Sequence, residues 1–599
     1  MIKFFLHGIL CVFCVKTAAG GEIKVVYPYE GLVIPSVSST FLFGSIVPST
    51  APFYINGSSI TVHQNGGFIA YLPVSEGNFA FNCELKEDAA SVFYIRNISV
   101  KPSATRQVST ATIAIEVILP SGDAEFMPGD WINVYAAGTP GKNAVFSIDD
   151  AVKNMKMSEI PGGSGRYYGT YQVGPLDLFS GSPVKAKFRT SAFSRTAMGV
   201  SKGKVSAMKK WNIVETSTET VILRSGPGMG YTMFLPEGVK LVSDGKAAGM
   251  RRIRLNNSES AWVDESKVRT MPSDTFAPVN ETGTIRVKNE GKYTSVSISG
   301  SEKIPYAIEE SGRVLSLFLY YSKLHTNWIV YDSSDVFVDR VSFRQVGSEV
   351  SRIDVALRDT EKLWGYDVYY STKSLVLELK HAPAIAAKWP APLGGLKVVV
   401  DPGHSPKNDP PYDGAVGPLG SFEYEVNLKI AQKLAEKLLE AGATVYMTRY
   451  GEENVALVER PKIARAAGGD IFISIHNNAI ADGENPFAAG RGFSVYHYHQ
   501  HSFELAKAVH ASYLKNINLA DEGLRYGDYL VARMTYMPSI LVENAYMILP
   551  EQEEMLNNPD FQAKLADTIT GGILDFFRIG PKPEPKKKKT GKKGNKVTR

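Results

Sequence analysis

Three apolar stretches in the last third of this chain each end in a side chain that can bind a metal. The stretches are residues 396–404, 471–476 and 539–543, and their last residues are His404, His476 and Glu543. In an open α/β sheet, functional sites form just beyond the carboxyl ends of the strands. Two imidazoles and a carboxylate at three such ends therefore predict one metal site.

Strands and helices alternate after a proline-marked linker at residues 390–392. We expect strands at 396–401, 444–449, 471–476, 492–499, 529–533 and 539–546. We expect helices at 422–441, 456–467, 502–515 and 560–577. Connections of this length suit parallel strands, so residues 394–579 should form an α/β domain with a mostly parallel, twisted sheet.

The residues before the linker predict an all-β region. Short apolar strands with turn residues between them recur, and Asn56-Gly57 between apolar segments is a strong hairpin signal. The expected units are a β-sandwich at 23–105, a second β-domain at 108–206, a small β-barrel at 210–272 and a β-domain at 280–383. The chain is thus multidomain, as its 599 residues also require.

The N-terminus has the pattern of a secretory signal. Residues 1–20 hold Lys3, an apolar stretch that is too short for a membrane span, and small residues at 18–20. A membrane anchor is the alternative. We therefore predict an exported protein, periplasmic or attached to the cell wall. Without this segment Cys83 remains as a lone cysteine, so no internal disulfide is expected.

The basic character of the chain belongs to its C-terminus. Residues 581–599 carry eight lysines and one arginine against one glutamate, a net charge of +8. The whole chain has +5, so the remainder has −3. A Pro/Lys-rich segment cannot build a core, and we expect residues 580–599 to be a disordered tail.

His404 and His476 would supply two ligands of a zinc site. Catalytic zinc keeps three protein ligands and leaves the fourth position to water. Glu423 is the best candidate for the third ligand, because it lies in the first turn of the helix that leaves the same rim after the loop 417–420. Taken alone, each histidine could be a hydrogen-bonded turn or core residue, and Glu423 could complement the helix dipole. Their convergence at one rim, with Glu543, favours a site.

Six ordered segments resemble zinc-dependent N-acetylmuramoyl-L-alanine amidases of the amidase-3 type. They are residues 399–404, 413–417, 420–428, 445–449, 474–479 and 538–543. The resemblance implies that His404, Glu423 and His476 hold one zinc ion and that Glu543 is the catalytic carboxylate. It also implies hydrolysis of the amide bond between N-acetylmuramic acid and L-alanine in peptidoglycan.

Two β-regions resemble modules found in cell-wall enzymes. Residues 210–272 resemble bacterial SH3-like domains through the segments 220–228 and 261–263, with an ordinary small barrel as the alternative. Residues 280–383, which alternate apolar and polar side chains, resemble the AMIN-like domain that often precedes amidase domains. These resemblances imply that the front of the chain docks the enzyme to the envelope.

The sequence departs from the amidase pattern in two places. Ser405-Pro406 replaces the usual glycine pair after the first histidine, and Tyr424 replaces a common lysine. Neither change removes a ligand, but both could alter the fit of substrate. The segment between His476 and Glu543 is short, so we expect no blocking helix and little autoinhibition.

Several alternatives stay open. A zinc peptidase that cuts within the stem peptide could use the same site, and a wall-binding or activator protein could carry a silent one. His497, His499 and His501 lie on a predicted strand and should share one face. They could form a second metal site or a solvent- or substrate-facing edge. Arg449 and Arg460 could contact acidic groups of a peptide or form internal ion pairs.

We expect peptidoglycan to be the main partner and the chain to be a monomer. The lysine-rich tail could bind an anionic envelope polymer or lipid, or remain solvated. It lacks the interleaved aromatic residues that stack on bases, so no nucleic-acid partner is expected.

Overall fold

The computed structural model describes residues 21–87, 91–101, 113–189, 197–372, 374–488 and 490–582. The predicted signal peptide and residues 583–599 of the predicted tail lie outside these residues. Within the described ranges no helix is long and apolar enough to cross a membrane. Cys83 is buried and free.

A six-stranded sheet forms the centre of the C-terminal region, in the order β37-β36-β38-β41-β39-β40. Its strands are β36 (Lys397–Pro402), β37 (Thr444–Met447), β38 (Ile471–Asn478), β39 (Gly492–His497), β40 (Ala520–Tyr526) and β41 (Ser539–Tyr546). Only β39 and β41 pair antiparallel within this sheet, and all other neighbours are parallel. The prediction of a mostly parallel α/β sheet is confirmed.

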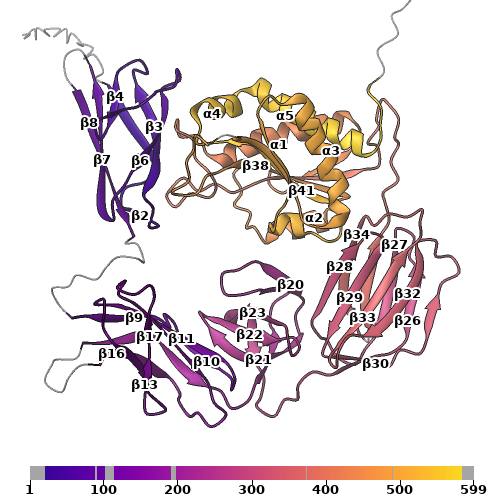
Figure 1. Cartoon of the computed structure of the whole chain (residues 1–599). Coiled ribbons are helices and arrows are strands. Elements are labelled where there is room, and N and C mark those ends of the chain that lie inside the picture. The colour runs from indigo at the N-terminus through magenta and orange to yellow at the C-terminus, as the bar shows by residue number, and fades with distance from the viewer. Residues whose placement is uncertain are drawn as a thin grey trace, which may run out of the picture.

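Helices cover both faces of this sheet (Figure 1). The helices are α1 (Glu423–Glu440), α2 (Glu459–Ala466), α3 (Gln500–Asn516), α4 (Pro550–Asn557) and α5 (Pro559–Phe576). Side chains of α1, α3 and α5 share one apolar core with the central strands. On the opposite face, Ala464 of α2 packs with Val399, Phe472 and Leu541 of the strands. The apolar stripe of α1 ends at Gly442, whose φ of +91° suits the helix C-terminus.

The sequence was misread at three elements, one of which is β40, where no strand was expected. Residues 529–533 are not a strand; they include the short 3-10 helix η2 (Leu530–Arg533), and the edge strand is β40. Val531 is buried against a face of the sheet and does not pair in it. Periodicity cannot tell whether a short apolar run forms a strand or packs against a sheet. The helix α4 was missed because Pro550, Met555 and Leu556 are its only apolar residues, too few to show a helical period.

Two sheets enclose the first apolar core. One is β1 (Glu22–Tyr27), β3 (Ser39–Val47) and β6 (Gly67–Pro73). The other is β2 (Leu32–Ile34), β8 (Ser91–Val100), β7 (Gly77–Lys86), β4 (Phe53–Ile55) and β5 (Ser58–Ser59). Asn56 and Gly57 join β4 to β5 with positive φ angles of 48° and 79°, as the hairpin signal predicts. We call residues 22–100 the N-terminal lobe.

A twelve-stranded sheet runs through the next two regions. It contains β10 (Ala124–Phe126), β12 (Ala144–Ile148), β13 (Val152–Lys156), β16 (Ser182–Phe188), β17 (Met198–Ala207), β18 (Asn212–Thr216), β19 (Val221–Arg224), β20 (Tyr231–Leu235), β21 (Lys240–Ala247), β22 (Met250–Arg254), β23 (Ser260–Asp264) and β24 (Val268–Thr270). A four-stranded sheet packs on its first part: β9 (Ile115–Leu119), β11 (Trp131–Gly138), β14 (Ser158–Glu159) and β15 (Arg166–Gln172). The short helix η1 (Glu265–Lys267) precedes β24.

Strand β10 joins two regions that the sequence separates. It pairs with β17 on one side and with β21 on the other, and Arg252 forms an ion pair with Asp130 across the same boundary at 2.7 Å. The apolar cores of the two regions remain distinct. Residues 115–207 and 212–270 are therefore two packed units that share a continuous sheet.

Two further sheets face each other around one core in residues 280–380. They are β26 (Ile285–Asn289), β27 (Tyr293–Ser299), β31 (Ile329–Tyr331), β34 (Gly365–Ser371) and β35 (Ser374–Lys380), and β28 (Tyr306–Ser311), β29 (Val314–Tyr320), β32 (Val338–Gln345) and β33 (Val350–Leu357). β25 (Asn280–Thr282) and β30 (Ser322–Leu324) form a separate pair. We call residues 280–380 the pre-linker sandwich.

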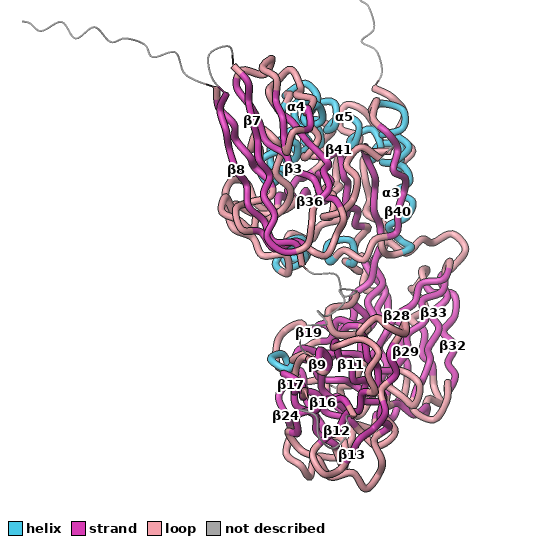
Figure 2. The backbone as a smooth tube through the Cα atoms, turned by 60° about the vertical axis from the view of Figure 1, so that its left-hand side comes forward, coloured by secondary structure: helices cyan, strands magenta, loops and turns pink. Residues whose placement is uncertain are grey.

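The N-terminal lobe and the pre-linker sandwich both contact the α/β domain (Figures 1 and 2). The Tyr27 hydroxyl donates to Asp482 Oδ1 at 2.7 Å, and the Tyr71 hydroxyl donates to the Gly483 carbonyl at 2.9 Å. From the sandwich, Trp364 Nε1 donates to the Asp470 carbonyl at 2.7 Å, and its ring packs near Phe576. The sheets before the linker therefore buttress the α/β domain from two sides.

Candidate metal centre

His404, Glu423 and His476 meet at the carboxyl edge of the parallel strands. His404 follows β36, His476 lies on β38, and Glu423 is the first residue of α1. His404 Nε2 lies 3.3 Å from Glu423 Oε2, and His476 Nδ1 lies 3.2 Å from Glu423 Oε1. One ligand atom from each residue lies within 4.8 Å of the other two. The structure thus brings together the three side chains that the sequence selects.

Asp413 orients the imidazole of His404. Its Oδ1 lies 2.8 Å from His404 Nδ1, on the side of the ring away from Glu423. Burial by itself lowers the pKa of His404, but the carboxylates of Glu423 and Asp413 outweigh burial and raise that pKa to about 10. By accepting the Nδ1 proton, the Asp413 carboxylate fixes the tautomer and orientation of the ring and makes Nε2 more basic, which is the role of an outer carboxylate in His–metal sites.

The Glu423 carboxylate is buried and held from several directions. Oε2 accepts from the Ala415 amide at 2.7 Å, and Oε1 accepts from the Asn477 amide at 3.0 Å and from Asn427 Nδ2 at 3.2 Å. Burial raises its pKa, but the two imidazoles outweigh burial and hold the pKa of Glu423 well below its usual range. The group is an anion with a fixed orientation.

Two glycines allow these rings to approach. A Cβ on Gly403 would lie 2.3 Å from His476 Cε1 and Nε2. Gly414 has φ +91°, and a Cβ there would lie 2.8 Å from Glu423 Oε2 and from the His404 ring. No larger side chain fits at either position without displacing a donor.

Glu543 lies beside the three donors. It is on β41, paired in register with His476 on β38. Its Oε2 is buried and has no hydrogen-bond partner in the described residues. Burial and the charge of Glu423 raise the pKa of Glu543 well above its usual range. A carboxyl group whose pKa is raised in this way can take up a proton and pass it on.

The donor set fits zinc. One ligand atom from each of the three residues lies within 4.8 Å of the other two, and each imidazole nitrogen lies beside a different oxygen of the Glu423 carboxylate, at 3.3 and 3.2 Å. Two imidazole nitrogens and one carboxylate are a catalytic zinc set with a fourth position for water. His404, Glu423 and His476 are therefore the residues that could hold the ion.

Arg449 and Arg460 are internal and do not face a substrate. Arg460 donates to Asp401 Oδ1 at 2.7 Å and to the His404 carbonyl at 2.7 Å. Arg449 donates to the carbonyls of Gly403 and Tyr424 at 3.2 and 2.6 Å. Both guanidinium groups fix the turn after β36, so the suggestion that they contact an acidic peptide is wrong.

The supporting residues Asp413, Asn427 and Asn477 were not singled out from the sequence. A signal was present for each of them: Asp413 and Asn477 lie in the motifs quoted for the family resemblance, and Asn427 is four residues after Glu423. Residues four apart share one helix face.

The three histidines at 497–501 do not share a strand face, because β39 ends at His497 and α3 begins at Gln500.

A mostly parallel α/β sheet with this donor set at its carboxyl edge is the arrangement of a metal-site hydrolase domain. Residues 398–575 match the family described as N-acetylmuramoyl-L-alanine amidase. The uncharacterized protein YqiI of Bacillus subtilis is 30% identical over 204 residues, which cover 34% of this chain and 93% of that relative. The chain belongs to the N-acetylmuramoyl-L-alanine amidase family through this region.

Other relatives match the same part of the chain. N-acetylmuramoyl-L-alanine amidase LytC of B. subtilis is 30% identical over 187 residues, 31% of this chain and 36% of LytC. The match thus spans about a third of the length of that relative. The solved N-acetylmuramoyl-L-alanine amidase AmiC2 of Nostoc punctiforme is 34% identical, with a TM-score of 0.28, over 30% of this chain and 97% of that structure.

Proposed function

We propose that this chain is a zinc-dependent hydrolase that cuts the amide bond between N-acetylmuramic acid and L-alanine in peptidoglycan. The observation that carries the proposal is the His404–Glu423–His476 cluster, with Glu543 beside it, inside the region that matches the amidase family. Zinc, when bound there, supplies a Lewis acid that polarises the amide carbonyl and makes water more acidic.

The four side chains divide into two roles. His404, Glu423 and His476 hold the ion, and the Asp413 carboxylate keeps the His404 ring in place at 2.8 Å. Glu543 takes the proton from the attacking water and passes it to the departing amine of L-alanine. Its buried oxygen without a hydrogen-bond partner among the described atoms, and its raised pKa, suit this transfer in both directions.

In this proposal the β-rich region before the linker targets the enzyme to the cell envelope. We assign an SH3-like role to residues 210–272 and an AMIN-like role to residues 280–383, both directed at the envelope. The protein acts outside the cytoplasm, in the periplasm or at the wall. The name of a relative, probable cell wall amidase LytH of Staphylococcus epidermidis, 32% identical over 186 residues, agrees with that location.

Product analysis tests the proposed reaction. The purified full-length chain is incubated with peptidoglycan, with and without a chelator, and the soluble products are identified by mass. We expect intact stem peptides with a free L-alanine amine, and no release after chelation. Cleavage within the stem peptide would indicate a zinc peptidase, and no cleavage by the zinc-loaded chain would indicate a binding protein; either contradicts the proposal.

Glu543→Gln provides the matched variant, because it keeps the size of the side chain and removes its proton transfer. We expect kcat to fall at least 10²-fold, the range that general acid–base catalysis contributes, while bound zinc stays unchanged. Activity close to that of the unaltered chain would disprove the role of Glu543. Loss of zinc would mean that it acts as a ligand.

A further inference from the structure

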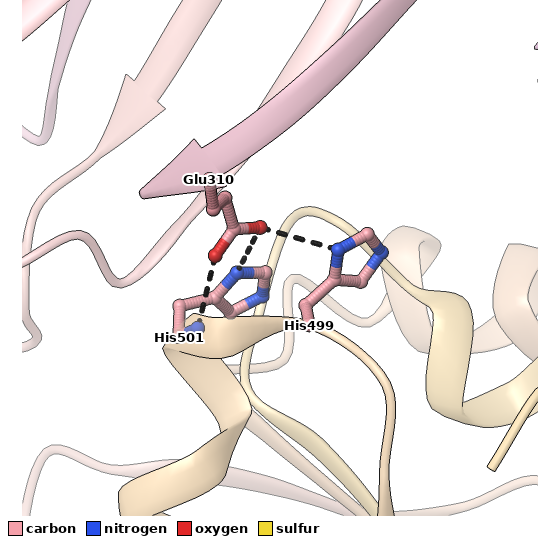
Figure 3. A group of neighbouring side chains, drawn as sticks. All are labelled: Glu310, His499 and His501. Carbon is pink, nitrogen blue, oxygen red and sulfur yellow. Dashed lines mark hydrogen bonds and ion pairs between the residues drawn. The ribbon is translucent and has the colours of Figure 1, made fainter. Parts of the chain in front are cut away.

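A second cluster of metal-binding side chains lies where the pre-linker sandwich meets the α/β domain. Glu310 lies on β28, His499 directly precedes α3, and His501 lies in the first turn of that helix. Figure 3 shows the three side chains pointing toward one another from these two parts of the chain. Glu310 Oε1 lies 3.2 Å from His499 Nδ1 and 2.9 Å from His501 Nδ1.

This cluster repeats the donor set of the first one. It offers two imidazole nitrogens and one carboxylate oxygen within 4.8 Å of one another, and it shares no residue with the amidase site. Its nitrogen–oxygen separations of 3.2 and 2.9 Å are close to the about 3.3 Å of a tetrahedral zinc site. The two imidazoles are stacked, with centroids 5.1 Å apart, so their Nδ1 atoms address the same carboxylate.

The hydrogen bond of His499 to the backbone leaves its Nδ1 unprotonated, with a free lone pair. Its Nε2 lies 3.0 Å from the Arg533 carbonyl oxygen, which only accepts, so the proton of a neutral ring is on Nε2. The Nδ1 lone pair then faces Glu310 Oε1 at 3.2 Å. Two lone pairs at that distance repel each other, and a cation bound by both atoms removes the conflict.

The cluster is nearly closed to solvent. The side chains of Glu310, His499 and His501 are 8%, 13% and 0% exposed. The ring of Tyr366 packs nearly perpendicular to both imidazoles, with centroids 5.9 and 6.0 Å away. A carboxylate this far from water needs a counter-charge.

His501 and the backbone fix the geometry further. The His501 amide donates to Glu310 Oε2 at 3.0 Å, which aims Oε1 at the two rings. His501 Nε2 is buried and has no hydrogen-bond partner in the residues that the structure describes. The polar interactions of this ring are therefore made through Nδ1, inside the cluster.

We propose that Glu310, His499 and His501 bind a second divalent cation of the zinc class, which fastens the pre-linker sandwich to the α/β domain. The mixed imidazole and carboxylate donors suit zinc and its neighbours better than calcium or magnesium. Three protein ligands leave the fourth position to water. The ion joins residues that lie 189 and 191 positions apart in the sequence, so it acts as a clasp between the pre-linker sandwich and the α/β domain.

Metal content of the full-length chain tests the clasp, without any assay of activity. After equilibration with a small excess of Zn²⁺ and gel filtration, we expect two zinc ions per chain. Glu310→Gln should bind one, because its amide keeps the size and accepts a hydrogen bond but is a poor zinc ligand. His476→Ala should also bind one, and the double variant should bind none.

The control is Glu309→Gln, which removes the same charge from the exposed neighbour on β28 and should still bind two ions. A single ion that Glu310→Gln loses and His476→Ala keeps would count against the metal of the amidase site. Equal zinc in Glu310→Gln and the unaltered chain, whether that chain binds one ion or two, would overturn the proposal. In that case a proton held between the rings and Glu310 replaces the ion.

Cobalt gives a second measurement that tolerates a loss of zinc during preparation. In His476→Ala, added Co²⁺ should produce the visible absorption of a four-coordinate site, and Zn²⁺ should displace it. Adding His499→Ala should abolish this absorption, with circular dichroism showing that the sheets remain folded. No Co²⁺ absorption in His476→Ala would contradict the clasp, whatever the outcome of the peptidoglycan assay.

Discussion

At the scale of single residues, the candidate metal site depends on the glycine at position 403 as much as on its three metal-binding side chains. Gly403 lies against the His476 ring, and Arg460 donates to the carbonyl of His404 at 2.7 Å. His404 itself has a positive φ of 61°. The Asp-Pro-Gly-His motif therefore supplies a metal ligand and also forms a turn, whose carbonyl groups accept hydrogen bonds from the buried side chains of Arg449 and Arg460.

Gly403→Ala should displace the His476 imidazole, because the new Cβ would lie 2.3 Å from two ring atoms. We expect zinc affinity and kcat/KM to fall at least tenfold, the range seen when the surroundings of a metal ligand change. Zinc titration and the peptidoglycan assay measure both. Gly451→Ala is the control, because its Cβ would lie 3.5 Å from the nearest atom, an ordinary contact; equal behaviour of the two variants would refute the argument.

At the scale of elements, a buried ion pair ties β36 to α2. Asp401 accepts from Arg460 Nη1 at 2.7 Å and from Ser474 Oγ at 2.7 Å, and Thr448 also donates to it. Burial raises the pKa of Asp401, but Arg460 and the two hydroxyls outweigh burial and lower that pKa. A carboxyl whose pKa is lowered on folding stabilises the fold above its unfolded pKa and loses that contribution as the pH falls.

Asp401→Asn should therefore destabilise the chain by about 3–5 kcal/mol at pH 7, because it leaves the buried Arg460 charge unpaired. The difference from the unaltered chain should narrow as the pH falls below the pKa of an unfolded aspartate, about 3.9, because the unfolded chain takes up the proton before the folded chain, whose Asp401 pKa is lowered. Denaturant unfolding at several pH values measures this. Asp409→Asn, at an exposed position, should change stability by less than about 0.5 kcal/mol; a constant difference for Asp401→Asn would contradict the assignment.

At the scale of the whole molecule, the N-terminal lobe covers the rim near the amidase site. Phe41 and Phe43 of the lobe share an apolar cluster with Val416 and Tyr546 of the α/β domain. Val416 lies in the loop that leads to Glu423, so this contact supports the wall of the site. The lobe thus has a structural role in the α/β domain beside any role in docking.

Tyr27 should anchor this contact. Its hydroxyl donates to Asp482 Oδ1 at 2.7 Å, and its ring stacks on Phe43 at 5.5 Å. Tyr27→Phe should weaken the contact by about 1 kcal/mol through the lost hydrogen bond, and Tyr27→Ala should weaken it further. Hydrogen exchange of the amides at residues 480–484 should speed up in that order. Tyr94→Phe, whose ring lies over Arg96 within the lobe, should not change it.

Much of the α/β domain could be predicted because its patterns are local. Strand β41 was predicted at its observed bounds, and α1 within one residue at each end. The three ligands were chosen because strand ends and helix starts meet at one edge of a parallel sheet. The short helix η2 was misread as a strand because an apolar run of four residues has no distinctive period, and α4 was missed because it has too few apolar side chains to show one.

The sequence by itself determined the parallel sheet, the three ligands at its edge and the carboxylate beside them, because each follows from periodicity and from the place where a strand stops. Only the tertiary structure decided that Glu310 meets His499 and His501, that β10 joins two sheets, and that Tyr27 reaches Asp482. These contacts join residues far apart in the chain. Such contacts are set by the packing of whole sheets against each other, which no local pattern of residues records.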